Sequence, residues 1–269
     1  MIEQKVKQTL KKIKLNKKEK IIVALSGGKD SAVTAYLLKK LGYSIEGIYI
    51  NLGIGKYSED CLKAIESLCK DLNIKLHVYD LKKETGKSIV TFFEKNTKKI
   101  SNCTICGVFK KWILNKESRK LKAKKIATGH HRNDELQTFL MNIFKGSPQL
   151  NSNFGPILNT KDPKFIIKIK PLFFVSEEEI ERYAKELKLP TVKEICPYRK
   201  ETYRVETRKL FEEISEKEKQ NMMKNFLELS KRIKKDKSKM NYCQLCEEPS
   251  RNKICKKCEL MRIKDSQTI

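Results

Sequence analysis

The sequence predicts an α/β protein built on a doubly wound parallel sheet, with a small cysteine-rich unit at its C-terminus. Strand-sized apolar runs alternate with helical segments from Lys20 to Leu187, and such repeats predict a parallel sheet with helices on both faces. Four cysteines fall within 241–269, a segment too short for a core of its own. The length of 269 residues suits one sizeable domain with such an appendage.

The individual elements follow from the apolar periodicity along the chain. We expect an amphipathic helix over 2–16 and strands over 20–25, 44–51, 75–79, 125–127 and 164–169. Helices are expected over 31–41, 58–72, 87–96, 109–121, 131–144 and 176–187, with a basic helical stretch over 201–234. Segment 147–163 is rich in Ser, Asn, Pro and Gly and predicts a loop. Ligands of such sheets bind beyond the carboxyl ends of the strands, so we expect the site in the loops after Leu25, Asn51 and Ala127.

The net charge of +26 is the strongest bulk feature. It favours a polyanionic partner, most often nucleic acid, whereas the alternative is that many lysines simply solvate helices. No apolar run is long enough for a membrane span, and the Lys-rich N-terminus lacks the apolar core of a signal peptide. These features predict an intracellular, cytoplasmic protein.

A phosphate-binding loop is predicted at Ser26-Gly27-Gly28-Lys29-Asp30-Ser31, between a buried strand and a helix. A helix N-terminus attracts anions, glycines let the backbone approach phosphates closely, and the lysine and serines add donors. The spacing is not that of a Walker loop. The alternative is a chance glycine turn.

The hexapeptide resembles the signature of the PP-loop ATP pyrophosphatases, whose fold is Rossmann-like. The resemblance implies that ATP is split between its α and β phosphates and that the substrate is adenylated. Gly129, in Thr128-Gly129-His130, is expected beside the nucleotide through its backbone.

Six of the nine cysteines form three Cys-x-x-Cys pairs, and in an intracellular chain these favour metal or redox chemistry. Alone, Cys103 and Cys106 are compatible with half a zinc site, a redox pair or two buried apolar side chains. Together with Lys110-Lys111, Asp134-Glu135, Gln137 and Cys196-Pro-Tyr, however, they resemble the tRNA 2-thiolation branch of the PP-loop family.

That resemblance implies a 4Fe–4S cluster held by Cys103, Cys106 and Cys196, with one iron left open to bind a sulfide. A competing scheme makes two of these cysteines, such as Cys103 and Cys196, a catalytic persulfide and disulfide pair, and a structural or inert set is a third alternative. The pair itself is expected to precede the helix over 109–121.

Lys110 and Asp134 fall where this branch carries catalytic residues. Lys110 lies one helical turn after Cys106 and would neutralise developing negative charge. Asp134 would orient Mg²⁺ or act as acid and base, whereas its alternative role is to stabilise a helix N-terminus. The branch often has two acidic residues here, but this chain has Asn133-Asp134, which leaves one carboxylate.

The C-terminal cysteines have the spacing of a structural zinc ribbon, because four thiolates in two short pairs close a tetrahedral site. They are Cys243, Cys246, Cys255 and Cys258. A second redox pair is the alternative. The basic run at Lys231, Arg232, Lys234, Lys235, Lys237 and Lys239 would contact RNA phosphates or form a solvated linker. Relatives usually carry a further N-terminal zinc ribbon, but this chain has no cysteine before Cys61.

The leading hypothesis is a tRNA 2-thiouridine synthetase that uses ATP, Mg²⁺, a 4Fe–4S cluster and Zn²⁺. Its expected divisions are a basic helix over 1–19, a PP-loop catalytic domain over 20–240 and a zinc ribbon over 241–269. Expected partners are tRNA, a sulfur donor (sulfide or a ubiquitin-like thiocarboxylate carrier) and a second copy of the chain. The alternatives are 2-thiocytidine or lysidine formation, and a non-catalytic RNA-binding protein.

Overall fold

The sheet at the centre of the molecule forms from the apolar runs identified above. The computed structural model describes residues 1–96, 100–160, 162–199, 203–234 and 240–262. Within them, one six-stranded sheet has the order β3-β2-β1-β4-β6-β5, in which only β5 runs antiparallel. Its strands are β1 (Ile21–Leu25), β2 (Ile45–Asn51), β3 (Leu76–Asp80), β4 (Lys125–Ala127), β5 (Ile157–Leu158) and β6 (Ile167–Ile169).

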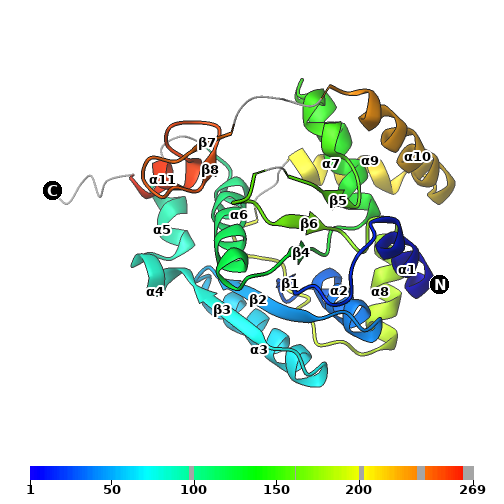
Figure 1. Cartoon of the computed structure of the whole chain (residues 1–269), viewed down its shortest axis with the longest axis horizontal. Coiled ribbons are helices and arrows are strands. Elements are labelled where there is room, and N and C mark those ends of the chain that lie inside the picture. Colours follow the sequence, from blue (N-terminus) through cyan, green and yellow to red (C-terminus); the bar gives the residue numbers. More distant parts are fainter. Residues whose placement is uncertain (97–99, 161, 200–202, 235–239, 263–269) are drawn as a thin grey trace.

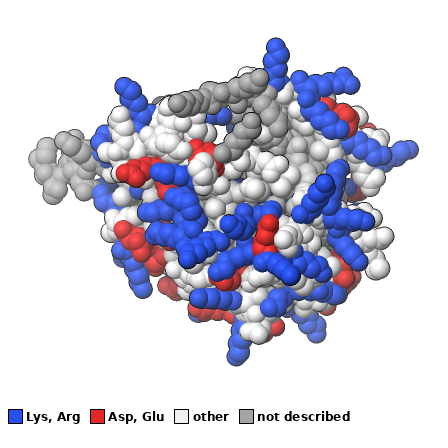
Figure 2. Space-filling model, viewed as in Figure 1, with Lys and Arg blue, Asp and Glu red and all other residues white. Residues whose placement is uncertain are grey.

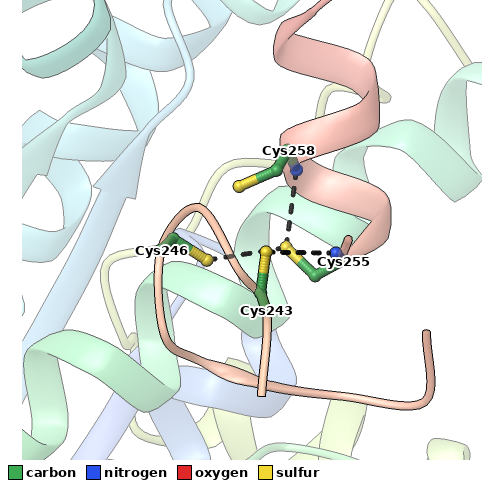
Figure 3. A group of neighbouring side chains, drawn as sticks. All are labelled: Cys243, Cys246, Cys255 and Cys258. Carbon is green, nitrogen blue, oxygen red and sulfur yellow. Dashed lines mark hydrogen bonds between the residues drawn. The ribbon is translucent and has the colours of Figure 1, made fainter. Parts of the chain in front are cut away.

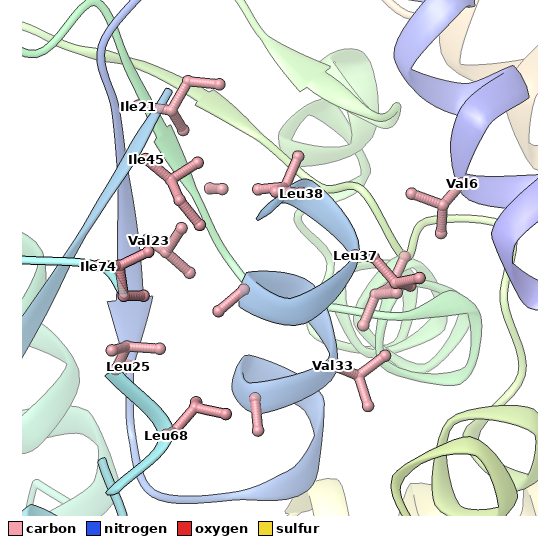
Figure 4. Packing of buried hydrophobic residues seen from close by; sticks show 14 of the residues in the cluster. Val6, Ile21, Val23, Leu25, Val33, Leu37, Leu38, Ile45, Leu68 and Ile74 are labelled. Carbon is pink, nitrogen blue, oxygen red and sulfur yellow. The ribbon is translucent and has the colours of Figure 1, made fainter. Parts of the chain in front are cut away.

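Helices cover both faces of this sheet, as the prediction of a doubly wound fold requires (Figure 1). On one face, Ile21, Val23 and Leu25 of β1 pack with side chains of four helices: α1 (Ile2–Lys12), α2 (Lys29–Lys40), α3 (Gly55–Asp71) and α8 (Glu177–Glu186). Figure 4 shows α2 and Val6 of α1 in this core. On the other face, Ile22 and Ile126 pack against Leu114 of α6 (Asn102–Lys120). The predicted fold is confirmed.

The start of α6 differs from the prediction. The Cys103–Cys106 pair was expected to precede the helix, but both residues lie within its first two turns. The Ser101 hydroxyl accepts a hydrogen bond from the Thr104 amide at 3.2 Å, and this cap starts the helix seven residues earlier than its apolar pattern indicates. The pair therefore sits on a helix and not in a loop.

Two other segments also differ. The predicted loop 147–163 contains the short helix η1 (Pro148–Asn153) and the edge strand β5. The predicted helix over 201–234 is two helices, α9 (Tyr203–Glu212) and α10 (Glu216–Arg232), because Ser215 caps a new helix through the Glu218 amide. Residues 200–202 lie outside the described residues, as do Lys235, Lys237 and Lys239 of the basic run.

The remaining elements are short or lie between the main ones. After β4 comes α7 (Arg132–Phe144), and two short helices, α4 (Leu81–Thr85) and α5 (Ile89–Glu94), follow β3. The C-terminal unit has β7 (Asn241–Tyr242), β8 (Pro249–Ser250) and α11 (Lys256–Met261). No helix in the described part of the chain is long and apolar enough to cross a membrane.

The N-terminal helix is fastened to α8 by an ion pair. Lys5 Nζ lies 2.7 Å from Glu179 Oε1, and the same carboxylate accepts a hydrogen bond from the Ser176 amide at 3.0 Å. Burial alone would raise the pKa of Glu179, but the Lys5 ammonium and the Ser176 amide outweigh it and lower the pKa. A carboxyl with a depressed pKa stabilises the fold above its unfolded pKa, and this stabilisation is lost as the pH falls through the folded pKa.

Glu179→Gln is therefore expected to lower the free energy of unfolding by about 1 kcal/mol at pH 7, because the pair is only partly buried. The difference from wild type should shrink below about pH 4, where the wild-type carboxyl is protonated. Denaturant unfolding at neutral and acid pH measures both values. Glu181→Gln is the matched control, since Glu181 pairs with Lys185 on the exposed surface of the same helix. An equal loss in both variants would contradict the prediction.

Candidate active site

The phosphate loop is closed on itself by Ser31. The Ser26 amide donates to Ser31 Oγ at 3.2 Å, and Ser31 Oγ donates to the Gly28 carbonyl at 2.9 Å. Gly28 is the N-cap of α2, so the loop runs directly into the N-terminus of a 12-residue helix. Backbone N–H groups at such a position form an anion site.

Two glycines allow other segments to approach this loop closely. Gly27 has φ +84°, and a Cβ on it would lie 2.9 Å from Cys61 Cβ. A Cβ on Gly129 would lie 2.8 Å from the carbonyl carbon of Asp30 and 2.9 Å from the Ser31 amide nitrogen. The loop after β4 therefore packs backbone to backbone on the start of α2. The Val192 amide donates to the Gly27 carbonyl at 2.8 Å and adds a third segment.

A carboxylate that the sequence analysis missed holds the lysine of the loop. Glu177 Oε1 lies 3.1 Å from Lys29 Nζ, and Glu177 Oε2 lies 3.4 Å from an Arg208 guanidinium nitrogen on α9. The sequence analysis placed Glu177 in a predicted helix and gave it no role. Nothing in the local sequence links it to Lys29, because the two residues lie 148 positions apart.

Acidic side chains from three helices converge beside the loop. Burial raises the pKa of Asp30, and the carboxylates of Asp134 and Glu177 raise it further against the opposing effect of His131 and Lys29. Asp30 Oδ1 is buried and has no hydrogen-bond donor among the described residues. His131 is buried at the N-cap of α7, with Nε2 3.4 Å from Asp134 Oδ2. Asp134 thus helps to cap α7, as its alternative role required, while also belonging to this acidic group.

The structure brings the three dispersed cysteines to one region at the start of α6. Cys106 and Cys196 are half-buried against the apolar cluster around Phe92 and Phe109, and Cys103 is exposed. Burial raises the pKa of Cys106 to about 11, with Lys110 opposing the rise and Cys196 and Cys103 adding to it. Cys106 and Cys196 pack on one apolar cluster, and Cys103 and Lys110 lie three and four residues from Cys106 on the same helix.

This thiol group also adjoins the phosphate loop. Cys61, which touches Gly27, has a pKa that burial raises, Lys110 lowers and Cys196 raises. Cys103, Cys106 and Cys196 are not among the side chains close enough to share a single ion. Three thiols that are too widely spaced to share one ion, two of them packed on an apolar cluster, fit an iron–sulfur cluster better than a tetrahedral zinc site.

The four C-terminal cysteines form a separate centre (Figure 3). Their sulfur atoms all lie within 4.8 Å of one another, as a single tetrahedral ion requires. The Cys255 amide donates to Cys243 Sγ at 3.2 Å. Burial alone would raise the pKa of Cys243, but the amides of Cys255, Leu245 and Cys246 outweigh it and lower the pKa to about 6.

This C-terminal unit docks on α6, the helix that carries Cys103 and Cys106. The Glu248 carboxylate pairs with Arg119 and accepts from Asn115 Nδ2 at 3.4 Å. Lys257 Nζ lies 4.0 Å from the centre of the Trp112 ring, close enough for a cation–π contact. Leu260 of α11 is buried in the apolar cluster beneath Cys106 and Cys196. The two cysteine centres therefore share one helix.

Comparison with known proteins gives the family. A PP-loop domain model matches residues 1–210. The chain belongs to the PP-loop family. It is 37% identical over 268 residues to the tRNA-5-methyluridine(54) 2-sulfurtransferase of Pyrococcus horikoshii, covering 97% of this chain and 85% of the relative. The enzyme of the same name from Thermotoga maritima is 30% identical, with 97% and 87% covered.

A solved PP-loop structure has the same architecture. The U34-tRNA thiolase NcsA of Methanococcus maripaludis, determined with its [4Fe-4S] cluster, matches with a TM-score of 0.81 and 28% identity. The match covers 96% of this chain and 85% of the thiolase. The resemblance to the tRNA 2-thiolation branch is confirmed.

Gly129→Ala is expected to separate the β4 loop from α2, because its Cβ would meet backbone atoms that have no freedom to rotate away. We expect ATP affinity to fall at least roughly tenfold, since a small displacement disturbs a site that depends on positioning. Isothermal titration with a non-hydrolysable ATP analogue measures this. Gly155→Ala is the control, because a Cβ there meets no atom within 4 Å. Unchanged affinity in Gly129→Ala would contradict the prediction.

Proposed function

We propose that this protein is a tRNA 2-sulfurtransferase, which uses ATP to adenylate the C2 oxygen of a uridine and then replaces that oxygen with sulfur. The observation that carries the proposal is the meeting of two sites. A phosphate loop and a group of three thiols with Lys110 adjoin each other through Cys61 and Gly27. Adenylation and sulfur transfer require such adjacency, because the adenylated uridine must react with sulfur before water hydrolyses it.

ATP binds through the phosphate loop and Gly129. The hexapeptide Ser26-Gly27-Gly28-Lys29-Asp30-Ser31 receives the phosphates at the N-terminus of α2. Lys29 exchanges its Glu177 partner for a phosphate oxygen. Asp30, Asp134 and Glu177 would hold Mg²⁺, because the carboxylates of Asp134 and Glu177 act on the charge of Asp30 and the three groups offer the oxygen ligands that Mg²⁺ prefers.

Lys110 and Asp134 act on the uridine. The exposed Lys110 ammonium neutralises negative charge that develops on the α-phosphate oxygens as the C2 oxygen attacks phosphorus. Asp134, held by the capping contact with His131, would either orient Mg²⁺ or accept the proton that uridine N3 loses on adenylation. The target atom lies on the edge of the base, so the uridine must unstack from its neighbouring bases to reach Lys110 and Asp134.

Cys103, Cys106 and Cys196 hold a 4Fe–4S cluster. When bound, the cluster supplies an iron without a protein ligand, where sulfide can be held for transfer. The cluster in the 28% identical thiolase structure supports this assignment. The persulfide scheme, which would use Cys103 and Cys196, is the competing chemistry.

Zn²⁺ would be held by Cys243, Cys246, Cys255 and Cys258. The zinc ribbon would then stabilise α6 through its contacts with Arg119, Asn115 and Trp112. The relative from Caenorhabditis elegans is named cytoplasmic tRNA 2-thiolation protein 1, which supports a cytoplasmic location. The sulfur donor, sulfide or a thiocarboxylate carrier, and the homodimer stay predictions, as do the boundaries of the three expected divisions.

Anaerobically reconstituted protein is expected to form a 2-thiouridine in tRNA when given ATP and sulfide, with AMP and pyrophosphate as products. Mass spectrometry of the nucleosides measures the thiolated base, and sequencing of digested fragments locates it. Lys110→Ala should lower the rate at least about 100-fold, because a charge that stabilises the transition state is lost. Lys120→Ala, an exposed lysine at the other end of α6, is the control. Wild-type protein that forms no thiolated nucleoside would refute the proposed function.

Removing zinc should release the ribbon from α6. Trp112 is the only tryptophan, and it contacts Lys257 of the ribbon, so its fluorescence reports docking. Cys258→Ser is expected to bind less than one zinc per chain, shift Trp112 emission to longer wavelength and weaken cluster retention. Cys69→Ser, a buried thiol far from both centres in the sequence, is the control. Full zinc content in Cys258→Ser, measured by elemental analysis, would contradict the assignment.

A further inference from the structure

A pair of lysines lies between α6 and β6, outside the site described above. Hydrogen bonds fasten α6 to the chain that leads into β6. Asn115 Nδ2 donates to the Lys164 carbonyl at 2.8 Å, and Asn115 Oδ1 accepts from the Ile166 amide at 2.9 Å. One turn further along the helix, Arg119 donates to the same Lys164 carbonyl at 2.6 Å.

The same alignment of α6 with β6 brings two lysines together nearer the active site. Helix residues four apart share a face, so Lys111 precedes Asn115 on the face that meets this segment. Strand residues two apart share a face, so Lys168 follows Ile166. Lys168 also pairs with Ile126 of β4, which packs against α6. Lys111 of α6 and Lys168 of β6 therefore face each other where the helix packs on the strand.

Their surroundings are strongly positive. Burial, together with the charges of Lys111 and Lys170, lowers the pKa of Lys168 to about 8. Lys170 is compensated by Glu135, whose Oε2 lies 2.6 Å from Lys170 Nζ. Among the described residues, no carboxylate lies within 4.0 Å of the ammonium of Lys168 or Lys111. A half-buried ammonium without a counter-charge is costly, and a bound anion would remove that cost.

The surface of α6 is open on the side of the lysine pair nearest the thiols, at Gly107. Gly107 lies one turn before Lys111, and a Cβ there would meet no atom within 4 Å. Lys111 is five residues from Cys106, which is about 7.5 Å along a helix axis. Figure 2 shows basic side chains gathered on the face of the molecule that α6 covers.

We propose that Lys168 and Lys111 bind a backbone phosphate of the tRNA beside the nucleotide that is thiolated. The ATP phosphates are a poorer match, because they bind at the N-terminus of α2, which packs on the opposite face of the sheet from α6. The net charge of +26 also suits a large polyanion. The assignment rests on the proposed function, since it requires tRNA as the substrate.

The test compares tRNA binding by the full-length, reconstituted protein and by Lys168→Met, using an unmodified tRNA transcript between about 50 and 200 mM salt. Loss of one phosphate contact should weaken binding roughly five- to tenfold at low salt and reduce the salt slope by about one. ATP affinity should not change, and the melting temperature should not fall, because the variant removes an uncompensated buried charge. Lys168→Arg should keep the wild-type slope.

Lys111→Met is the second variant, and it should show the same loss of slope from an exposed position that folding does not require. Lys63→Met is the matched control, because Lys63 is exposed on α3, which covers the opposite face. Wild-type binding and slope in Lys168→Met, or an equal loss in Lys63→Met, would overturn the inference. So would a loss of ATP affinity without a loss of tRNA affinity. Wild-type protein that neither binds nor thiolates tRNA would instead refute the proposed function.

Discussion

The close approach of Gly129 to the backbone of Asp30 and Ser31 is the constraint on which the rest of the site depends. It joins the loops after β1 and β4, the two strands at which the sheet changes its winding direction. Because of this contact, the N-terminus of α7 lies close to the N-terminus of α2. Asp134 and His131 are then near enough to Asp30 to shift its pKa. A side chain at position 129 would open the junction and separate the nucleotide from the acidic group.

The helix α6 carries the second half of the chemistry and connects it to the periphery. Its first turns hold Cys103, Cys106 and Lys110, its middle packs on the sheet, and its last turns hold the ribbon through Arg119. The four cysteines of the C-terminal unit could hold a structural metal ion, which would stabilise a small unit that has no apolar core of its own. The contacts of Glu248 with Arg119 and Asn115 fix the far end of the helix, so that the thiols at the near end keep their position relative to the phosphate loop.

Much of this arrangement could be predicted from sequence, because its signals are local. The alternation of apolar runs predicts the sheet, and the glycine-rich hexapeptide predicts the anion site. The start of α6 was missed because a single Ser101 hydrogen bond extends the helix beyond its apolar pattern. Glu177 and Lys168 were missed for a different reason. Each acquires its role from partners distant in the chain, and a sequence contains no sign that Glu177 meets Lys29 or that Lys168 lacks a carboxylate.

The sequence offers one carboxylate at Asn133-Asp134, and the fold brings two more close to it. Asp30 comes from the phosphate loop and Glu177 from the first turn of α8. Glu177 is paired with Lys29 and Arg208, and these two positive charges offset the repulsion among the three carboxylates. Phosphates and a divalent cation would enter together, since the phosphates attract the lysine and arginine while the cation takes the carboxylates. The ion pairs at Glu177 thus balance charge beside the phosphate loop.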